Sequence, residues 1–307
     1  MSEPETPTPR TLRRAVLLML VSTLMFGSMA VAIRYASAQL HPFEIAFFRN
    51  LFGFVFALPL LFKHGPSLLK TSKLSLYFMR CLMGIVSMLC GFWAIVHLPL
   101  AQAVSISYST PLFVTIGAVL VLGEVVRIRR WTAVIAGFLG VLVIVRPGAE
   151  GFSFAALIAL AAAALSACVA ISIKFLSRTE KPDSIVLYTT LLWVPMSLVP
   201  ALMVWVWPTG ITWLWIVLAG FFGTAGHMVW TRALKLADAS LLTPISFFQV
   251  VVVAIYGWAL FGESLDRYTV IGASIVFASC AYIAHREAVL ARRAVTDREI
   301  GAEAAPR

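Results

Sequence analysis

The sequence predicts an all-α integral membrane protein built from ten transmembrane helices. Of its 307 residues, 61% are apolar and 12% are charged, whereas soluble domains usually carry about 25% charged residues. The mean hydropathy is +0.92, which excludes a soluble protein. Because a helix that crosses the hydrocarbon needs about 20 apolar residues, a chain of this length has room for roughly ten such helices and no ordinary soluble domain.

Ten apolar runs follow one another along the chain. The first comes after a polar, basic start that ends at Arg14; it is too long for the core of a signal peptide and lacks a small-residue cleavage site. The least secure runs are the second, which carries Arg49 and Asn50, and the fifth, which is short. We expect membrane helices at residues 15–35, 44–62, 74–96, 100–122, 130–146, 152–176, 184–206, 212–235, 239–261 and 268–285.

Basic residues lie in every second connecting segment and so predict the orientation. They precede the first helix, separate helices 2 and 3, 4 and 5, and 6 and 7, and follow helices 8 and 10. Because cytoplasmic loops retain Lys and Arg, both termini should lie on the cytoplasmic side of the membrane. The membrane itself is expected to be a bacterial-type inner (plasma) membrane. Residues 1–14 form the predicted cytoplasmic N-terminal segment, and residues 286–307 a charged cytoplasmic tail that is either a helical extension or a disordered end. The net charge of +10 is spread over these loops, so it indicates topology and no nucleic-acid partner.

The two halves of the chain repeat each other. Arg34-Tyr-Ala-Ser37 matches Lys174-Phe-Leu-Ser177 at an offset of 140 residues, and Gly123-Glu124 matches Gly262-Glu263 at an offset of 139. The shared order of the matches predicts two five-helix repeats, residues 15–147 and 152–285. Since five is odd, the second repeat enters the membrane from the opposite side. Inverted repeats of this kind are used by transporters to expose one central site alternately to the two sides.

These motifs resemble an EamA-type member of the drug/metabolite transporter superfamily. The resemblance rests on Arg80-Cys-Leu-Met-Gly84, His97-Leu-Pro-Leu-Ala-Gln102, Ser107-Tyr-Ser-Thr-Pro-Leu112, Gly226-His227, Ala233-Leu-Lys-Leu-Ala-Asp-Ala-Ser240, Thr243-Pro244, Gln249 and Gly257-Trp-Ala-Leu-Phe-Gly-Glu263. It implies a ten-helix basket with a cavity lined by helices 1, 3, 4, 6, 8 and 9, and with helices 5 and 10 at the periphery. It also implies a small-molecule substrate: such proteins export amino acids and related metabolites or take up riboflavin or S-adenosylmethionine.

The fourth and ninth helices carry the polar residues expected at the substrate site. Ser105, Tyr108 and Ser109 share one helical face, and the ninth helix contributes Ser246 and Gln249. Each helix also contains a proline, Pro111 in the fourth and Pro244 in the ninth. Because a proline inside a helix removes a hydrogen bond, we expect a bend at each proline that allows the helix to act as a gate.

The remaining candidates for the substrate site are His227, Trp230 and Arg80. His227, midway along the eighth helix, either faces the substrate and carries a proton or bonds a neighbouring helix. Trp230 and Tyr108 lie deep enough to stack on a planar substrate. Arg80, near the cytoplasmic end of the third helix, either attracts an anionic group or extends its side chain to the membrane interface. Arg49, near the outer end of the second helix, could extend to the interface in the same way.

The acidic residues limit the possible mechanisms of energy coupling. Glu44, Glu124, Asp238 and Glu263 all fall at helix ends, so no carboxylate is placed to carry a proton across the membrane centre. Either His227 couples protons to transport, or the protein is an exchanger or a facilitator.

The remaining function classes find little support in the residues. The four cysteines have neither CxxC spacing nor histidine neighbours, so neither a disulfide framework, a metal site nor a cofactor is expected. Motifs of membrane enzymes and nucleotide-binding loops are missing. The favoured interpretation is an exporter of amino-acid-like metabolites. The alternative is an importer of a vitamin or a nucleoside-type cofactor. A membrane-embedded enzyme or a non-transport subunit is less favoured. The protein is expected to be a monomer or a homodimer.

Overall fold

The computed structural model describes residues 9–61, 73–123, 128–147, 153–176, 182–237, 242 and 245–303. Every regular element in these ranges is a helix. Pro244, Glu124 and Asp238, which the sequence analysis singles out, lie outside the described residues. The helices are α1 (Pro9–Ala36), α2 (Pro42–Leu61), α3 (Leu74–His97), α4 (Leu100–Ser107), α5 (Thr110–Leu122), α6 (Ile128–Val145), α7 (Phe154–Leu176), α8 (Pro182–Leu202), α9 (Thr212–Leu236), α11 (Phe248–Phe261) and α12 (Arg267–Glu303).

Six of the described helical segments are long and apolar enough to cross a membrane. They are Arg10–Ala36, Leu74–His97, Leu100–Val121, Phe154–Ile173, Thr212–Leu236 and Arg267–His285. Shorter apolar helices occur at Trp131–Val145, Leu191–Leu202 and Phe248–Phe261. Each of the ten apolar runs in the sequence overlaps a described helix, and α12 continues past the last run as far as Glu303. The chain is therefore a multi-pass membrane protein.

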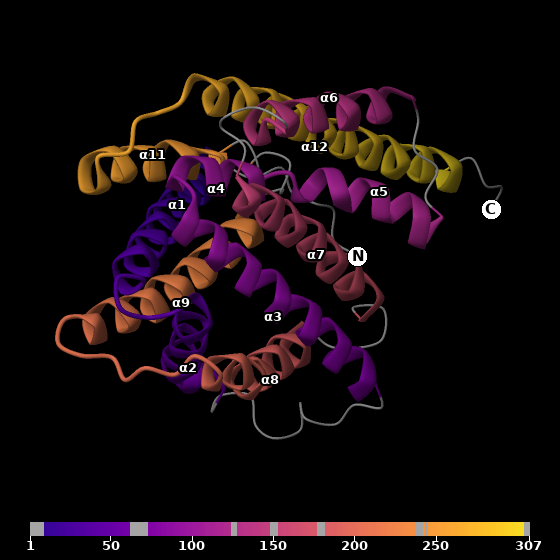
Figure 1. The fold of residues 1–307 in the computed structure, drawn as a ribbon. Coiled ribbons are helices and arrows are strands. Elements are labelled where there is room, and N and C mark those ends of the chain that lie inside the picture. The colour runs from indigo at the N-terminus through magenta and orange to yellow at the C-terminus, as the bar shows by residue number, and fades with distance from the viewer. Residues whose placement is uncertain are drawn as a thin grey trace.

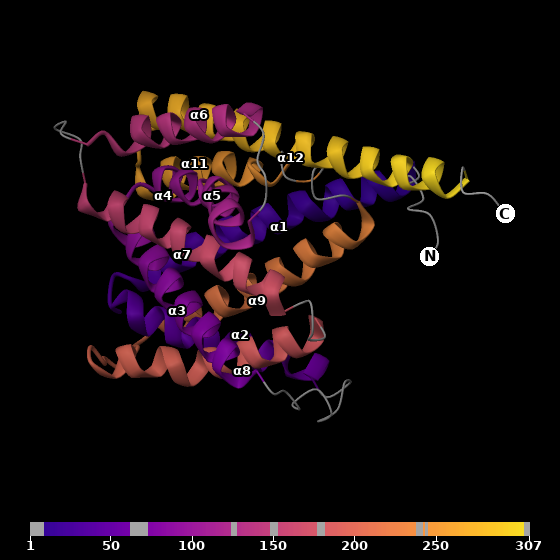
Figure 2. The same ribbon diagram turned by 90° about the vertical axis from the view of Figure 1, so that its right-hand side faces the viewer.

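The helices are arranged so that the two halves of the chain pack mainly against each other. Figures 1 and 2 show α6 lying along α12 on one side of the molecule, with α2 and α8 on the opposite side. Between these pairs, α1 packs on α9 and α3 on α7. One apolar core joins Leu112 and Ile144 of the first half to Ala156 and Val276 of the second. Neither half therefore buries its apolar surface alone.

Glycines allow the closest of these approaches. A Cβ atom at Gly140 of α6 would lie 2.9 Å from the carbonyl oxygen of Gly272 and 2.9 Å from Cβ of Ile275, both in α12. In lipid there is little hydrophobic gain from pairing two apolar helices, so close contact through small residues is a main source of attraction. The α6–α12 contact is of this kind.

The fourth apolar run forms two helices, because α4 ends at Ser107 and α5 begins at Thr110. Pro111 stands in the first turn of α5, where the missing N–H removes no helical hydrogen bond. The break itself lies at Tyr108 and Ser109. In the second half, α11 begins after Phe247. Tyr108 and Phe247 are separated by the same 139 residues as Gly123 and Gly262, so the helix breaks are equivalent in the two repeats.

The two repeats also end their broken helices in the same way. Gly123 follows α5 with φ of 66°, and Gly262 follows α11 with φ of 65°. This left-handed conformation is readily adopted only by glycine. No atom lies within 4 Å of a Cβ built at either position, so the backbone conformation alone demands glycine there.

We expect Gly123→Ala and Gly262→Ala each to destabilise the protein by roughly 1–2 kcal/mol, because a side chain is strained at positive φ. The measurement is the thermal unfolding midpoint of the purified protein in detergent. Gly91→Ala is the matched control, since Gly91 lies within α3 and its Cβ also meets nothing within 4 Å. Alanine is favoured over glycine in a helix, so this variant should unfold at the same or a higher temperature. Equal losses in all three variants would contradict the argument.

Candidate functional site

The candidate site lies where the two helix breaks meet. The ring of Tyr108 stacks on that of Phe247, with 4.1 Å between centroids and 27° between planes. The Tyr108 hydroxyl donates to the carbonyl oxygen of Ser246 and lies 3.2 Å from Oε1 of Gln249. Phe277 of α12 meets the Phe247 ring edge-on at 4.8 Å. Thus the structure brings together three of the predicted site residues, Tyr108, Ser246 and Gln249.

Local hydrogen bonding explains why the first break falls where it does. Three hydroxyl side chains donate to carbonyl oxygens three residues earlier: Ser107 to Val104 at 2.6 Å, Ser109 to Ile106 at 2.7 Å and Thr110 to Ser107 at 2.8 Å. Such bonds compete with the helical pattern and bend or end a helix. They also satisfy carbonyl groups that have no water to bond within the hydrocarbon.

Of the other two hydroxyls predicted on this face of the fourth run, neither reaches a neighbouring helix. Ser109 is fully buried, and its Oγ is used by the bond to Ile106. Ser105 is 1% exposed, and its Oγ has no hydrogen-bond partner. Of these three side chains, Tyr108 is the one that makes a described hydrogen bond to the second repeat.

His227 and Trp230 lie on a different surface. They share one face of α9 with Thr231, and all three side chains are exposed. The His227 ring contacts Phe26 of α1 edge-on, with 5.0 Å between centroids. Within the described residues, no hydrogen bond or ring contact joins His227 or Trp230 to Tyr108. The structure therefore places these predicted residues at two separate locations.

Arg80 is placed at a third location. It is 7% exposed, and its Nη1 donates to Oγ1 of Thr189 on α8. One turn away, Tyr77 stacks on Tyr188 of the same helix at 4.5 Å. In this conformation the guanidinium links α3 to α8.

The sequence analysis did not place Arg49 among the site residues, but the structure gives it a central position. Its Nη1 donates to Oδ1 of Asn50 at 3.0 Å. Asn50 is 4% exposed and donates from Nδ2 to Oγ of Ser197 on α8 at 3.2 Å. The signal in the sequence was an adjacent Arg-Asn pair inside an apolar run, and the direction of the arginine could not be read from it.

A polar network joins the helix ends near Arg34. Arg34 pairs with Oε1 of Glu263 at 3.1 Å and also donates to the carbonyl oxygen of Leu98. The second carboxylate oxygen of Glu263 accepts from the backbone N–H of Leu100 at 2.8 Å. A single carboxylate thus connects the end of α1, the start of α4 and the end of α11, as expected for a residue that sets helix ends.

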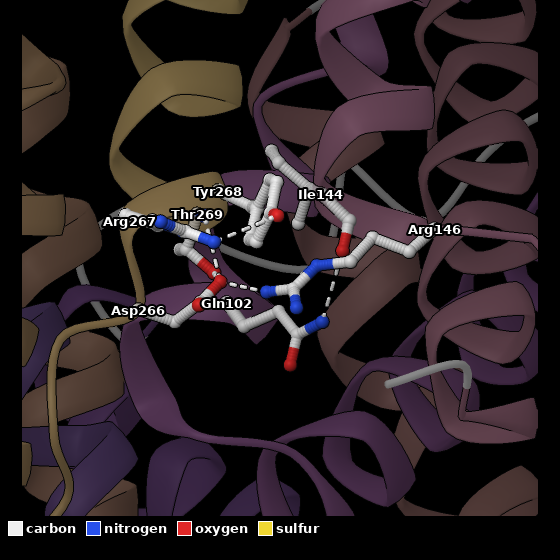
Figure 3. Close-up of polar contacts among 7 residues, drawn as sticks. All are labelled: Gln102, Ile144, Arg146, Asp266, Arg267, Tyr268 and Thr269. Carbon is white, nitrogen blue, oxygen red and sulfur yellow. Dashed lines mark hydrogen bonds and ion pairs between the residues drawn. The ribbon is translucent and has the colours of Figure 1, made fainter. Parts of the chain in front are cut away.

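A second cluster lies at the junction of α6 and α12 (Figure 3). Arg146 pairs with Asp266 and lies over the ring of Tyr268, 4.2 Å from its centroid. Asp266 also accepts from the backbone N–H of Thr269 at 3.1 Å, and Gln102 donates to the carbonyl oxygen of Ile144 at 3.2 Å. α6 ends next to the start of α12 here, so the cluster holds the two repeats together.

An apolar groove runs beside the candidate site. It has a volume of about 870 Å³ and lies between α11 and α12, with Val16 and Leu20 of α1 at its edge. Phe247 lines the groove and also stacks on Tyr108, so this ring belongs to both the candidate site and the groove.

Comparison with known proteins gives one family. The model of the EamA-like transporter family matches residues 13–146 and 153–284. A riboflavin transporter of Vibrio cholerae is 30% identical, with 91% of this chain and 96% of the relative covered. An S-adenosylmethionine uptake transporter of Rickettsia felis is 30% identical, with 87% and 91% covered. A pseudopaline exporter of Pseudomonas aeruginosa is 28% identical, with 88% and 95% covered.

A solved structure has the same fold. It has a TM-score of 0.63 and 21% sequence identity, and the match covers 91% of this chain and 98% of the other.

We expect Tyr108→Phe to lower stability by about 1 kcal/mol, because it removes a hydrogen-bond donor but keeps the stack on Phe247. The measurement is thermal unfolding in detergent. Tyr256→Phe is the control, since the Tyr256 hydroxyl has a single long contact of 3.5 Å to Ser28. If both variants unfold at the wild-type temperature, the Tyr108 hydroxyl does not help to hold the repeats together.

Proposed function

Because the chain belongs to the EamA-like transporter family, we propose that it is a secondary transporter of small organic metabolites that works by alternating access. The observation that carries this proposal is the stack of Tyr108 on Phe247. These residues occupy equivalent positions in the two repeats, each at a helix break. A site at such a junction can be opened to either side by tilting one repeat against the other.

The proposed topology has ten membrane helices, with α4 and α5 forming one of them, and both termini in the cytoplasm. The alternating basic loops support this orientation. It places Arg34, Glu263, Arg146 and Asp266 on the outer side of a bacterial inner membrane, in contact with the lipid interface. The protein functions there as a monomer or a homodimer.

In this mechanism the pairs near Arg34 close the outer side. Opening it requires separation of Arg34 from Glu263 and of Arg146 from Asp266, which tie the two repeats together. Tyr108, Ser246 and Gln249 lie at the pivot, and the breaks before Pro111 and α11 allow the helices to bend. Ser109, His227, Trp230, Arg80 and Pro244 complete the residues that we propose to influence substrate passage.

The favoured substrates are amino-acid-like metabolites leaving the cell. Import of a vitamin or a nucleoside-type cofactor is the second candidate, and the names of the riboflavin and S-adenosylmethionine uptake relatives support it. The exporter relative supports the first. Direction follows from gradients and energy coupling.

The experiment that tests the proposal compares metabolites in cells and in spent medium, using strains that lack or overproduce the protein. Export predicts that a metabolite accumulates in the medium on overproduction. Import predicts accumulation inside the cells when riboflavin or S-adenosylmethionine is supplied. No change in either compartment, with the protein present in the membrane, would contradict the transporter proposal.

For the site, we expect the double variant Tyr108→Ala with Gln249→Ala to reduce flux at least about tenfold, because it removes the stack and the hydrogen bonds at the pivot. Initial rates of flux are measured in cells with equal amounts of protein in the membrane. Cys168→Ala, at an exposed position of α7, is the control and should retain wild-type flux. Unchanged flux in the double variant would exclude this site.

A further inference from the structure

Arg49 is a charged residue for which the described part of the chain provides no counter-ion. Its Nη1 donates to the neutral amide oxygen of Asn50, its Nε is buried with no hydrogen-bond partner, and Nη2 makes no hydrogen bond to any described residue. Within the described ranges no carboxylate lies within 4.0 Å of the guanidinium. Glu44, the acidic residue of the same helix, is occupied at 2.7 Å by the N–H of Val206 and at 3.2 Å by that of His41.

The guanidinium does not extend toward the end of its own helix. Arg49 lies seven residues beyond Pro42, the first residue of α2, which is about 10 Å along the axis. Its side chain lies against Gly223, close to the middle of the 25-residue helix α9. A cation held at this depth in a membrane protein is costly and marks a functional site by default.

Glycine makes room for this side chain. A Cβ atom at Gly223 would lie 2.9 Å from both Nε and Nη2 of Arg49 and 2.9 Å from Sδ of Met29. The position therefore excludes any larger residue while Arg49 keeps this conformation. On the other side, Asn50 and its bond to Ser197 anchor Nη1, so both the backbone of α9 and the amide of Asn50 orient the guanidinium.

His227 adds a second polar group to this location. It follows Gly223 by one helical turn, so the two share a face of α9, and it lies within the electrostatic field of Arg49. Its side chain is exposed although it packs on Phe26. Arg49 is partly exposed as well. Thus a cation and an imidazole lie on the same side of α9, each with exposed surface, and no carboxylate of the described residues pairs with the cation.

We propose that Arg49 and His227 form an anion-binding subsite and that the transported metabolite carries a carboxylate or phosphate group, which supplies the missing counter-ion. The proposal rests on the transporter function and names the substrate class of that transporter. Arginine suits this role because it stays charged when desolvated and presents several N–H donors to one anion. The free Nη2 and the imidazole N–H are the donors available here. Trp230, on the same exposed face, offers an aromatic surface to the rest of the metabolite.

The test uses two pairs of compounds that differ in an anionic group. S-adenosylmethionine is compared with its decarboxylated form, and riboflavin 5′-phosphate with riboflavin. Binding is measured as the thermal stabilisation of the full-length protein in detergent over a concentration series, and transport as counterflow in liposomes. The wild-type protein should bind the anionic member of at least one pair about tenfold more tightly or better. The pair that responds distinguishes a carboxylate from a phosphate.

Two variants connect this preference to Arg49. Arg49→Gln should remove the difference within the responding pair. Asn50→Asp should also remove it, because it places a carboxylate next to the Nη1 of Arg49 and so supplies an internal counter-ion. The new ion pair offsets the lost donation from Nδ2 of Asn50 to Ser197, so the protein should remain folded. Arg267→Gln, which removes an exposed cation at the start of α12, is the control and should retain the full preference.

The outcomes separate this inference from the transporter proposal. Equal binding of both members in each pair by the wild type, including no binding of any of the four, overturns the anion subsite. So does a preference that persists in Arg49→Gln. If flux of a neutral metabolite is found in the strain comparison, the transporter proposal stands while the anion subsite fails.

Discussion

The need to satisfy backbone polar groups inside the hydrocarbon governs this structure. Within a helix the backbone N–H and C=O groups bond to one another, but at a helix break they need other partners. At the first break the hydroxyls of Ser107, Ser109 and Thr110 bond the carbonyl oxygens behind them. At the second, the Tyr108 hydroxyl reaches across to the carbonyl oxygen of Ser246. The bond at the second break therefore exists only while the two repeats are in contact, which is why we propose their junction as the movable site.

The same constraint explains where charges lie. The ion pairs of Arg34 with Glu263 and of Arg146 with Asp266 lie at helix ends, and all four side chains are partly exposed. In the proposed transport cycle water can solvate these groups when the pairs separate. Arg49 lies deeper and has no ion pair with any described residue. The two kinds of arginine therefore differ in role: Arg34 and Arg146 connect helix ends, whereas Arg49 is the one for which we propose an anionic ligand.

Much of the helical architecture could be predicted because it depends on hydropathy, a property of single segments. The expected helix at 74–96 is observed at Leu74–His97, and that at 212–235 at Thr212–Leu236. The repeat offset located Gly262, whose conformation the structure shows to be left-handed. The break at Tyr108 was not located, because the proline at 111 marks the first turn of the next helix and the hydroxyl bonds that end α4 depend on side-chain conformation.

Arg49 shows why the direction of a side chain escapes sequence analysis. An arginine in an apolar run can extend along its own helix to the interface or cross to a neighbour, and the hydropathy of the run is the same in both cases. The choice is made by α9, where Gly223 leaves space that any Cβ atom would fill, and by α8, where Ser197 fixes the Asn50 amide. Neither partner is near Arg49 in the sequence. A cation inside an apolar helix is thus recognised as a candidate binding group only after three helices are assembled around it. The absence of a carboxylate among its described neighbours then supports an anionic ligand.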